Sequence, residues 1–403
     1  MLRLSIALFL VQAGFHGFTA SIPLALARAG RADAEIGALV GVAALVQIPA
    51  ALAGGALIDR FGGLRLFVSG GICYLAATTL LFFSGVGEQA TPAIIVARIL
   101  QGTGFGLALP AGLSVVPRLV PASRRGVALA MAGASHNMTL VVLPPLSIAV
   151  LDAFGFDGVT VLVGGLVAGA LVLVWARRLQ EMAAGESHLQ PATRRFGFAY
   201  RRSWLAPLVV TVLFVVHWGV VIAYLPQRAE AAGANIGLFF VADGLFVLLA
   251  RVPAGWLADH TRPVWPVLGG IALTALGVLL LFPSPSTPLL IVSGTLTGVG
   301  AALIVQPLVL ALAQRSGDAD RGSAFALFSA CFAGAIAIGT IGTAPLIESL
   351  GFEAILAIAL VAVGMSALVV LADRDMRQPP SRPSEIADGG ELPLAAGTPI
   401  GPQ

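Results

Sequence analysis

Ionisable side chains at a few positions inside long apolar stretches are the residues of this sequence that could do chemistry. Three of the five histidines fall in such stretches: His16, His136 and His217. An imidazole changes charge near neutral pH, so histidines at one depth could take up and release protons. A single buried histidine is more often a neutral, hydrogen-bonded residue. Three at one level favour proton coupling.

Two arginines and one carboxylate also lie inside apolar stretches. Asp243 and Arg251 are eight residues apart, about 12 Å along a helix, so they cannot pair with each other. A charge in hydrocarbon costs at least a few kcal/mol and normally faces a cavity or a partner. Asp243 is therefore a candidate for proton binding, or else bonds a neighbouring helix structurally. Arg98 is a candidate for a proton relay or an anion contact, or else bonds backbone carbonyls as a packing residue.

Polar residues near these groups are candidates for lining a substrate cavity. Gln12, His16 and Thr19 are spaced by four and three, which places them on one face of a helix. The other candidates are Gln101, Asn137, Tyr224 and Arg251. Acidic residues are absent at depth from the first, fourth, seventh and tenth apolar stretches, which favours a neutral or anionic cargo.

The elements that must position these residues are membrane-spanning helices. The chain is 58% hydrophobic and 11% charged, too apolar for an ordinary soluble domain. A helix needs about 20 apolar residues to cross a bilayer, and runs such as 36–58 are apolar on all sides, unlike barrel strands. We predict an all-α integral membrane protein with twelve spans: 4–27, 35–57, 66–87, 92–116, 126–150, 158–176, 205–226, 236–257, 264–283, 287–312, 323–346 and 352–372.

The spans form two groups of six. We expect an N-terminal bundle over 1–176, a basic cytoplasmic linker over 177–204 and a C-terminal bundle over 205–372. The tail 373–403 is proline-rich with little apolar content, which predicts disorder.

Arginine distribution predicts the orientation. All 23 basic residues are arginine, and most fall on the side that holds both termini, where positive charge accumulates in cytoplasmic loops. Only Arg28, Arg31 and Arg228 fall between spans on the other side. We therefore expect a multi-pass protein of a bacterial inner membrane with both termini in the cytoplasm. Its first apolar run is too long for a cleaved signal peptide.

The two halves repeat each other in the same direction, the parallel arrangement in which halves rock about a central site. Shifts of 200 and 196 residues relate them. The matched pairs are Gly55 with Gly255, Leu57 with Leu257, Asp59 with Asp259, Gly102 with Gly298 and Arg125 with Arg321.

The loop after the second span contains a motif that indicates the family of the protein. It reads Gly55-Ala-Leu-Ile-Asp59-Arg60-Phe-Gly62-Gly-Leu-Arg65 and resembles the signature loop of the major facilitator superfamily. In that family the loop latches the two halves together on the cytoplasmic side. From the residues themselves, we expect Gly55 to permit close helix contact and Gly62 to allow a tight turn. The second half keeps Gly255 and Asp259 but replaces the rest.

Two further motifs indicate in which direction such a protein would move its substrate. The sequence from Arg98 to Gly104 is similar to a second signature of the family and to its efflux members, whereas the glycines expected around Pro144 in antiporters are missing. The resemblance implies a secondary transporter of a small metabolite or drug-like molecule. Proton-coupled efflux is preferred and an uptake symporter is the alternative. A membrane sensor, or an enzyme, is favoured less.

The expected partners follow from this interpretation. They are a small-molecule substrate, protons and the lipid bilayer, with the protein a monomer. No cofactor, metal or nucleic acid is expected, and Cys73 and Cys331 are expected only to pack.

Overall fold

The computed structural model describes residues 2–116, 125–175, 200–317 and 320–378. For residues 2 and 3, Asp59, residues 125–134 and Arg321, only the backbone is described. The predicted linker therefore lies largely outside the described residues, as does the tail from 379 onward. The described part is helical and contains no strand.

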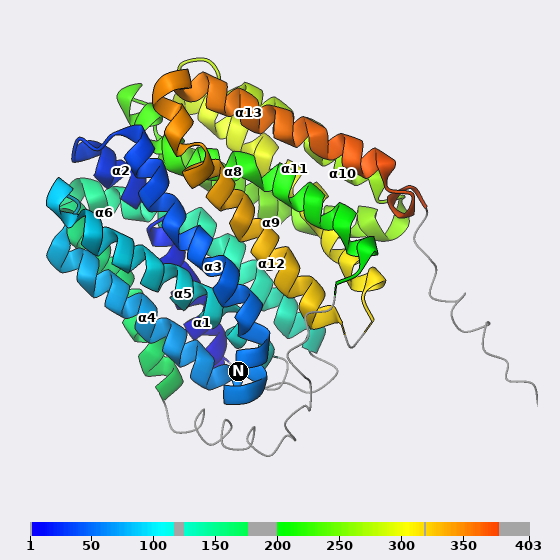
Figure 1. Ribbon diagram of the computed structural model, residues 1–403, viewed down its shortest axis with the longest axis horizontal. Coiled ribbons are helices and arrows are strands. Elements are labelled where there is room, and N and C mark those ends of the chain that lie inside the picture. The colour runs from blue at the N-terminus through cyan, green and yellow to red at the C-terminus, as the bar shows by residue number, and fades with distance from the viewer. Residues whose placement is uncertain (1, 117–124, 176–199, 318–319, 379–403) are drawn as a thin grey trace, which may run out of the picture.

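Long helices of two sequence halves form two adjacent groups (Figure 1). The first group comprises α1 (Leu2–Gly17), α2 (Ser21–Arg28), α3 (Asp33–Phe61), α4 (Gly63–Ser84), α5 (Thr91–Val115) and α6 (Arg125–Trp175). The second comprises α8 (Leu205–Ala231), α9 (Ile236–His260), α10 (Val264–Leu279), α11 (Thr287–Arg315), α12 (Arg321–Ala337), the π-helix η5 (Ile338–Gly342) and α13 (Ala344–Ala372). Short 3₁₀ turns are η1 (Glu88–Ala90), η4 (Arg202–Trp204) and η6 (Asp375–Arg377).

Ten helices of the described chain are long and apolar enough to cross a membrane, and α10 is a shorter apolar helix. The helix α6 joins two helices across Gly155 (φ 69°), and α13 bends in the same way at Gly351 (φ 80°). Only glycine adopts such a φ without strain. The break at Gly155 lies between the predicted spans 126–150 and 158–176. The count of twelve spans stays a prediction.

Glycines let helices of one half approach closely. A Cβ on Gly102 of α5 would meet the backbone of Ala43 on α3, and a Cβ on Gly298 of α11 would meet the backbone of Asp243 on α9. These contacts are related by the two shifts that relate the sequences. The repeat therefore extends to the packing of individual helix pairs.

The expectation for Gly55 is wrong, and that for Gly62 is confirmed. A Cβ on Gly55 would meet nothing within 4 Å, because the adjacent Gly54 is the residue that faces Pro110 of α5, and successive residues point about 100° apart on a helix. Gly255 is open in the same way. Gly62 ends α3 with a φ of 86° and begins α4, so it makes the tight turn that the sequence predicts.

The two halves pack together at the end of the molecule that carries α2, which we call the α2 end. One hydrophobic cluster there contains Ala20 of the first half with Tyr224 and Ile236 of the second. The end that carries the N-terminus is the opposite one (Figure 1), which we call the terminal end. Of the described clusters, those at the terminal end each come from one half, such as that of Leu4 and Phe67.

Residues 373–378 pack against the second half. Met376 is buried, and Asp373 pairs with Arg315 at 2.8 Å. Disorder from residue 373 onward is therefore wrong for this stretch, because a buried ion pair and an apolar side chain hold it.

Close packing at Gly102 predicts a stability difference. We expect Gly102→Ala to lower the free energy of unfolding by roughly 1–3 kcal/mol, the usual cost of overpacking, because the methyl group meets backbone that cannot rotate away. Thermal unfolding in detergent measures this. Gly55→Ala, on the neighbouring helix, is the matched control: its methyl group meets no atom and it gains only the higher helix propensity of alanine, so its midpoint should not fall. Equal midpoints for both variants would contradict the packing argument.

Candidate functional site

A polar cluster joins α1 and α6 between the two ends of the molecule, and we call it the central cluster: Gln12, His16, Ser135, His136 and Thr139. The Gln12 amide donates to Ser135 at 3.3 Å and its carbonyl oxygen is hydrogen-bonded to Nδ1 of His136 at 3.0 Å. His16 Nδ1 is hydrogen-bonded to the Thr139 hydroxyl at 2.8 Å. The two imidazole rings have centroids 4.7 Å apart.

Arg251 of the second half faces this cluster. It lies half-buried on α9, the helix of the second half that packs against α6, which carries His136. Helices α6 and α9 are in extensive contact, with Gly244 of α9 against Val141 of α6. The site thus combines a guanidinium from one half with two imidazoles and neutral polar groups from the other.

The structure brings together only some of the predicted site residues. His217 is buried on α8 and bonded to the Phe214 carbonyl of its own helix. Of the three predicted histidines, only His16 and His136 therefore lie together. Thr19 lies beyond the end of α1, in a turn, so helical spacing does not carry the predicted stripe to it. Asn137 is buried on α6 beside His136. Tyr224 lies at the α2 end, where its hydroxyl donates to the Thr340 carbonyl at 3.2 Å.

Arg98 holds two helices of the first half together. Its Nε donates to the Leu39 carbonyl at 3.1 Å, one Nη donates to the Val40 carbonyl and the other to Gln101 Oε1 at 2.6 Å. These are the backbone bonds of a packing arginine, the alternative that the sequence left open. Gln101 is fully buried beside it.

Asp243 is bonded within the second half. It is buried on α9 and accepts a hydrogen bond of 2.8 Å from the Thr297 hydroxyl of α11. Thr297 is the repeat mate of Gln101, and Asp243 that of Ala43. At this level of the fold, the first half therefore carries an arginine bonded to an amide, Arg98 with Gln101. The second half carries a carboxylate bonded to a hydroxyl, Asp243 with Thr297.

The signature loop lies at the terminal end. Arg60 and Arg65 are exposed, and the Arg60 guanidinium lies 5.2 Å from the ring centroid of Phe61. Asp259 is exposed at the end of α9, and the side chain of Asp59 lies outside the described part. The latch expected from the resemblance therefore remains a prediction.

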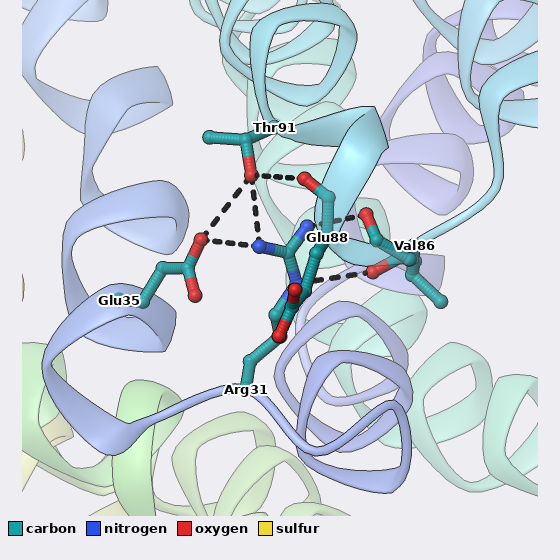
Figure 2. A network of polar contacts seen from close by, with 6 residues as sticks. Arg31, Glu35, Val86, Glu88 and Thr91 are labelled. Atoms are coloured by element: carbon teal, nitrogen blue, oxygen red, sulfur yellow. Dashed lines mark hydrogen bonds and ion pairs between the residues drawn. The ribbon is translucent and has the colours of Figure 1, made fainter.

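Arg31 is the centre of a network that sequence reasoning missed (Figure 2). Its side chain is only 3% exposed, and it pairs with Glu35 on α3 and donates to Thr91 at 2.8 Å and to the Val86 carbonyl at 3.3 Å. It thereby fixes the loop before α3 to the loop before α5. Arg31 lies in the loop before α3, so the helical i,i+4 rule did not indicate its pair with Glu35.

Arg28, at the end of α2, is a second missed residue. It donates to Asp152 of α6 at 2.6 Å and to Glu230 of α8 at 2.8 Å, so it joins the two halves. Its partners lie 124 and 202 residues away, which no local pattern indicates. Among the described residues, no group of three or more histidine, cysteine, aspartate or glutamate side chains could hold a metal ion.

Comparison with known proteins decides the family. The family model of the Major Facilitator Superfamily matches residues 4–242 and, again, 208–400. The chain belongs to the major facilitator superfamily. The double match is what a repeat of two halves should give.

Relatives and solved structures agree with this family. The chain is 28% identical to monocarboxylate transporter 11 of Mus musculus over 74% of its own length and 67% of the relative. It is 26% identical to the 3-(3-hydroxy-phenyl)propionate transporter of Escherichia coli over 57% of each chain. The crystal structure of a D-xylose-proton symporter has the same fold, with a TM-score of 0.72 at 17% identity over 93% of this chain and 98% of that one.

The bonds of Arg98 predict a structural role. We expect Arg98→Met to lower the free energy of unfolding by roughly 1.5–3 kcal/mol, because carbonyls of α3 lose a charged donor in a buried place. Thermal unfolding in detergent measures this, with Arg60→Met at the exposed loop as the matched control. A variant of unchanged stability that no longer transports would instead place Arg98 in the transport mechanism.

Proposed function

We propose that this superfamily member is a secondary transporter that carries a small organic anion together with protons, by alternating access of its two halves. The observation that carries the proposal is Arg251, a half-buried arginine of α9, the helix that packs against the His136-bearing helix α6 of the opposite half. A cation at the boundary between two moving halves is suited to hold an anion that both halves contact.

The chemistry of the central cluster supports a carboxylate as the substrate group. A guanidinium offers two parallel N–H donors that match the two oxygens of a carboxylate. Gln12, His16 and Thr139 offer hydrogen-bonding groups on the other side of the boundary. Two relatives are named for a monocarboxylate and for a phenylpropionate, both of which carry such a group.

Proton coupling is supported by Asp243 and by charge balance. A carboxylate buried in hydrocarbon is costly when ionised, and Asp243 has the Thr297 hydroxyl as a donor. A proton that travels with a monovalent anion makes the cycle electrically neutral. This favours symport over the efflux by antiport that the helix motifs predict. We further propose a monomer in a bacterial inner membrane, with both termini cytoplasmic.

Flux into vesicles under an imposed pH gradient tests the function. We expect purified protein in liposomes to accumulate 3-(3-hydroxyphenyl)propionate or a short monocarboxylate when the outside is acidic, with the membrane potential clamped. An antiporter would instead release preloaded substrate under the same gradient. Protein-free liposomes measure passive entry of the weak acid. Flux no greater than theirs in either direction, across the carboxylate panel, would contradict the proposal.

Arg251 supplies the matched variants for this assay. We expect Arg251→Gln to weaken carboxylate binding at least about tenfold, a loss of about 1.4 kcal/mol. Arg251→Lys keeps the charge but lacks the two parallel N–H donors of a guanidinium, so its carboxylate affinity should lie between those of the wild type and Arg251→Gln. Unchanged affinity in Arg251→Gln, in protein that is folded by thermal unfolding, would remove Arg251 from the binding site.

Asp243 is tested by separating accumulation from exchange. We expect Asp243→Asn to abolish proton-driven accumulation while substrate exchange between the two sides of the vesicle continues, because the amide keeps a partner for Thr297 but cannot ionise. Thr297→Val keeps the carboxylate and is the matched control, which should still accumulate substrate. Normal accumulation by Asp243→Asn would exclude Asp243 as the proton carrier.

A further inference from the structure

The contacts between the halves at the α2 end include one charged group with two partners. Arg28 Nη2 lies 2.6 Å from Asp152 Oδ1 and 2.6 Å from Glu230 Oε1. Asp152 belongs to the same half as Arg28, whereas Glu230 belongs to the other half. One guanidinium nitrogen is thus shared by two carboxylates. Separation of the halves would move Glu230 away from Arg28 but would leave Asp152 beside it.

Other contacts between the two halves surround the ion pairs of Arg28 at the α2 end. The Gln227 amide donates to Asp33 at 3.3 Å across the same boundary. Side chains of the second half fill the space above glycines of α3: Tyr224 lies against Gly37, and Thr340 with Ile341 against Gly41. A further arginine at this end, Arg228, pairs instead with Glu353 of its own half at 3.7 Å.

We propose that Arg28 is an exchangeable clasp, held by both carboxylates when the α2 end is closed and by Asp152 alone when it is open. Glu230 stabilises the closed state. Asp152 favours opening, because it repels Glu230 only while the halves are together and keeps Arg28 paired when they part. The clasp rests on the alternating access of the proposed function and is independent of the substrate.

The two carboxylates therefore have opposite effects on one equilibrium. Removing Glu230 deletes an attraction found only in the closed state. Removing Asp152 deletes a repulsion found only in the closed state, while its attraction to Arg28 is present in both. Because the side chains of Arg28, Asp152 and Glu230 are 37%, 54% and 40% exposed, solvent screening keeps each effect small.

The test measures the distance between the halves at the α2 end without any substrate. Spin labels are attached through Gln89→Cys in the first half and Ser284→Cys in the second, with Cys73 and Cys331 replaced by serine. Electron–electron resonance then gives the fractions of short and long distances. We expect a Gly41→Ala background to populate the open state, because its methyl group would meet Thr340 and Ile341 of the other half when the α2 end is closed.

In that background we expect Glu230→Gln to raise the ratio of long to short distances by roughly two- to fivefold, the range for exposed ion pairs. Asp152→Asn should lower the same ratio, and high salt should reduce both effects. Glu353→Gln, whose partner Arg228 lies in the same half, is the control and should leave it unchanged.

Shifts in the same direction for Asp152→Asn and Glu230→Gln, or no shift in either, would overturn the clasp. A single distance in every variant, including the Gly41→Ala background, would overturn the clasp together with the alternating access on which it rests. Opposite shifts in a protein that moves no carboxylate would leave the clasp standing and refute only the substrate assignment.

Discussion

A polar side chain in the hydrocarbon core has no water to bond, so it must find its partner within the protein, and much of this fold follows from that constraint. Arg98 donates to carbonyls of the neighbouring helix α3, and Asp243 accepts from Thr297 on α11. Each of these bonds fixes a pair of helices within one half. The two rigid halves that alternating access needs are thus held partly by the residues that looked most reactive in the sequence.

The same layer of the two halves carries opposite chemistry. In the first half the α3–α5 contact is closed by a guanidinium of α5 that donates to backbone carbonyls of α3, and in the second the α9–α11 contact is closed by a carboxylate and a hydroxyl. The backbone contacts at Gly102 and Gly298 are nevertheless equivalent. Duplication therefore preserved the close approach of the helices, which a Cβ would prevent, while the polar groups beside it diverged. This divergence leaves the second half with a buried carboxylate, Asp243, the group that we propose as the proton carrier.

The sequence predicts a feature well when nearby residues determine it, and poorly when a contact with another helix determines it. The positions of Gly62, Gly155 and Gly351 follow from apolar runs and from glycine's tolerance of positive φ, so the helix boundaries were predictable. The direction in which Gly55 faces depends on the rotation of α3 against α5, which composition does not contain. His217, which the sequence predicts at the depth of His16 and His136, is bonded to its own helix. The sequence therefore indicated which helix carries each residue, but it did not indicate the side of the helix or the bonding partner.

Two helices, α6 and α9, carry both the central cluster and contacts between the halves at the α2 end. Helix α6 holds His136 and also Asp152, which are 16 residues or about 24 Å apart along its axis. Helix α9 holds Arg251 and also Gly237, which packs against Pro145 of α6 at the α2 end. On the proposed function, an anion bound beside Arg251 would act on the same pair of helices whose far ends meet beside the clasp. Because Pro144 and Pro145 lie in α6 between His136 and Asp152, this helix has a natural place to bend, so binding at the centre can be coupled to separation at the α2 end through that segment.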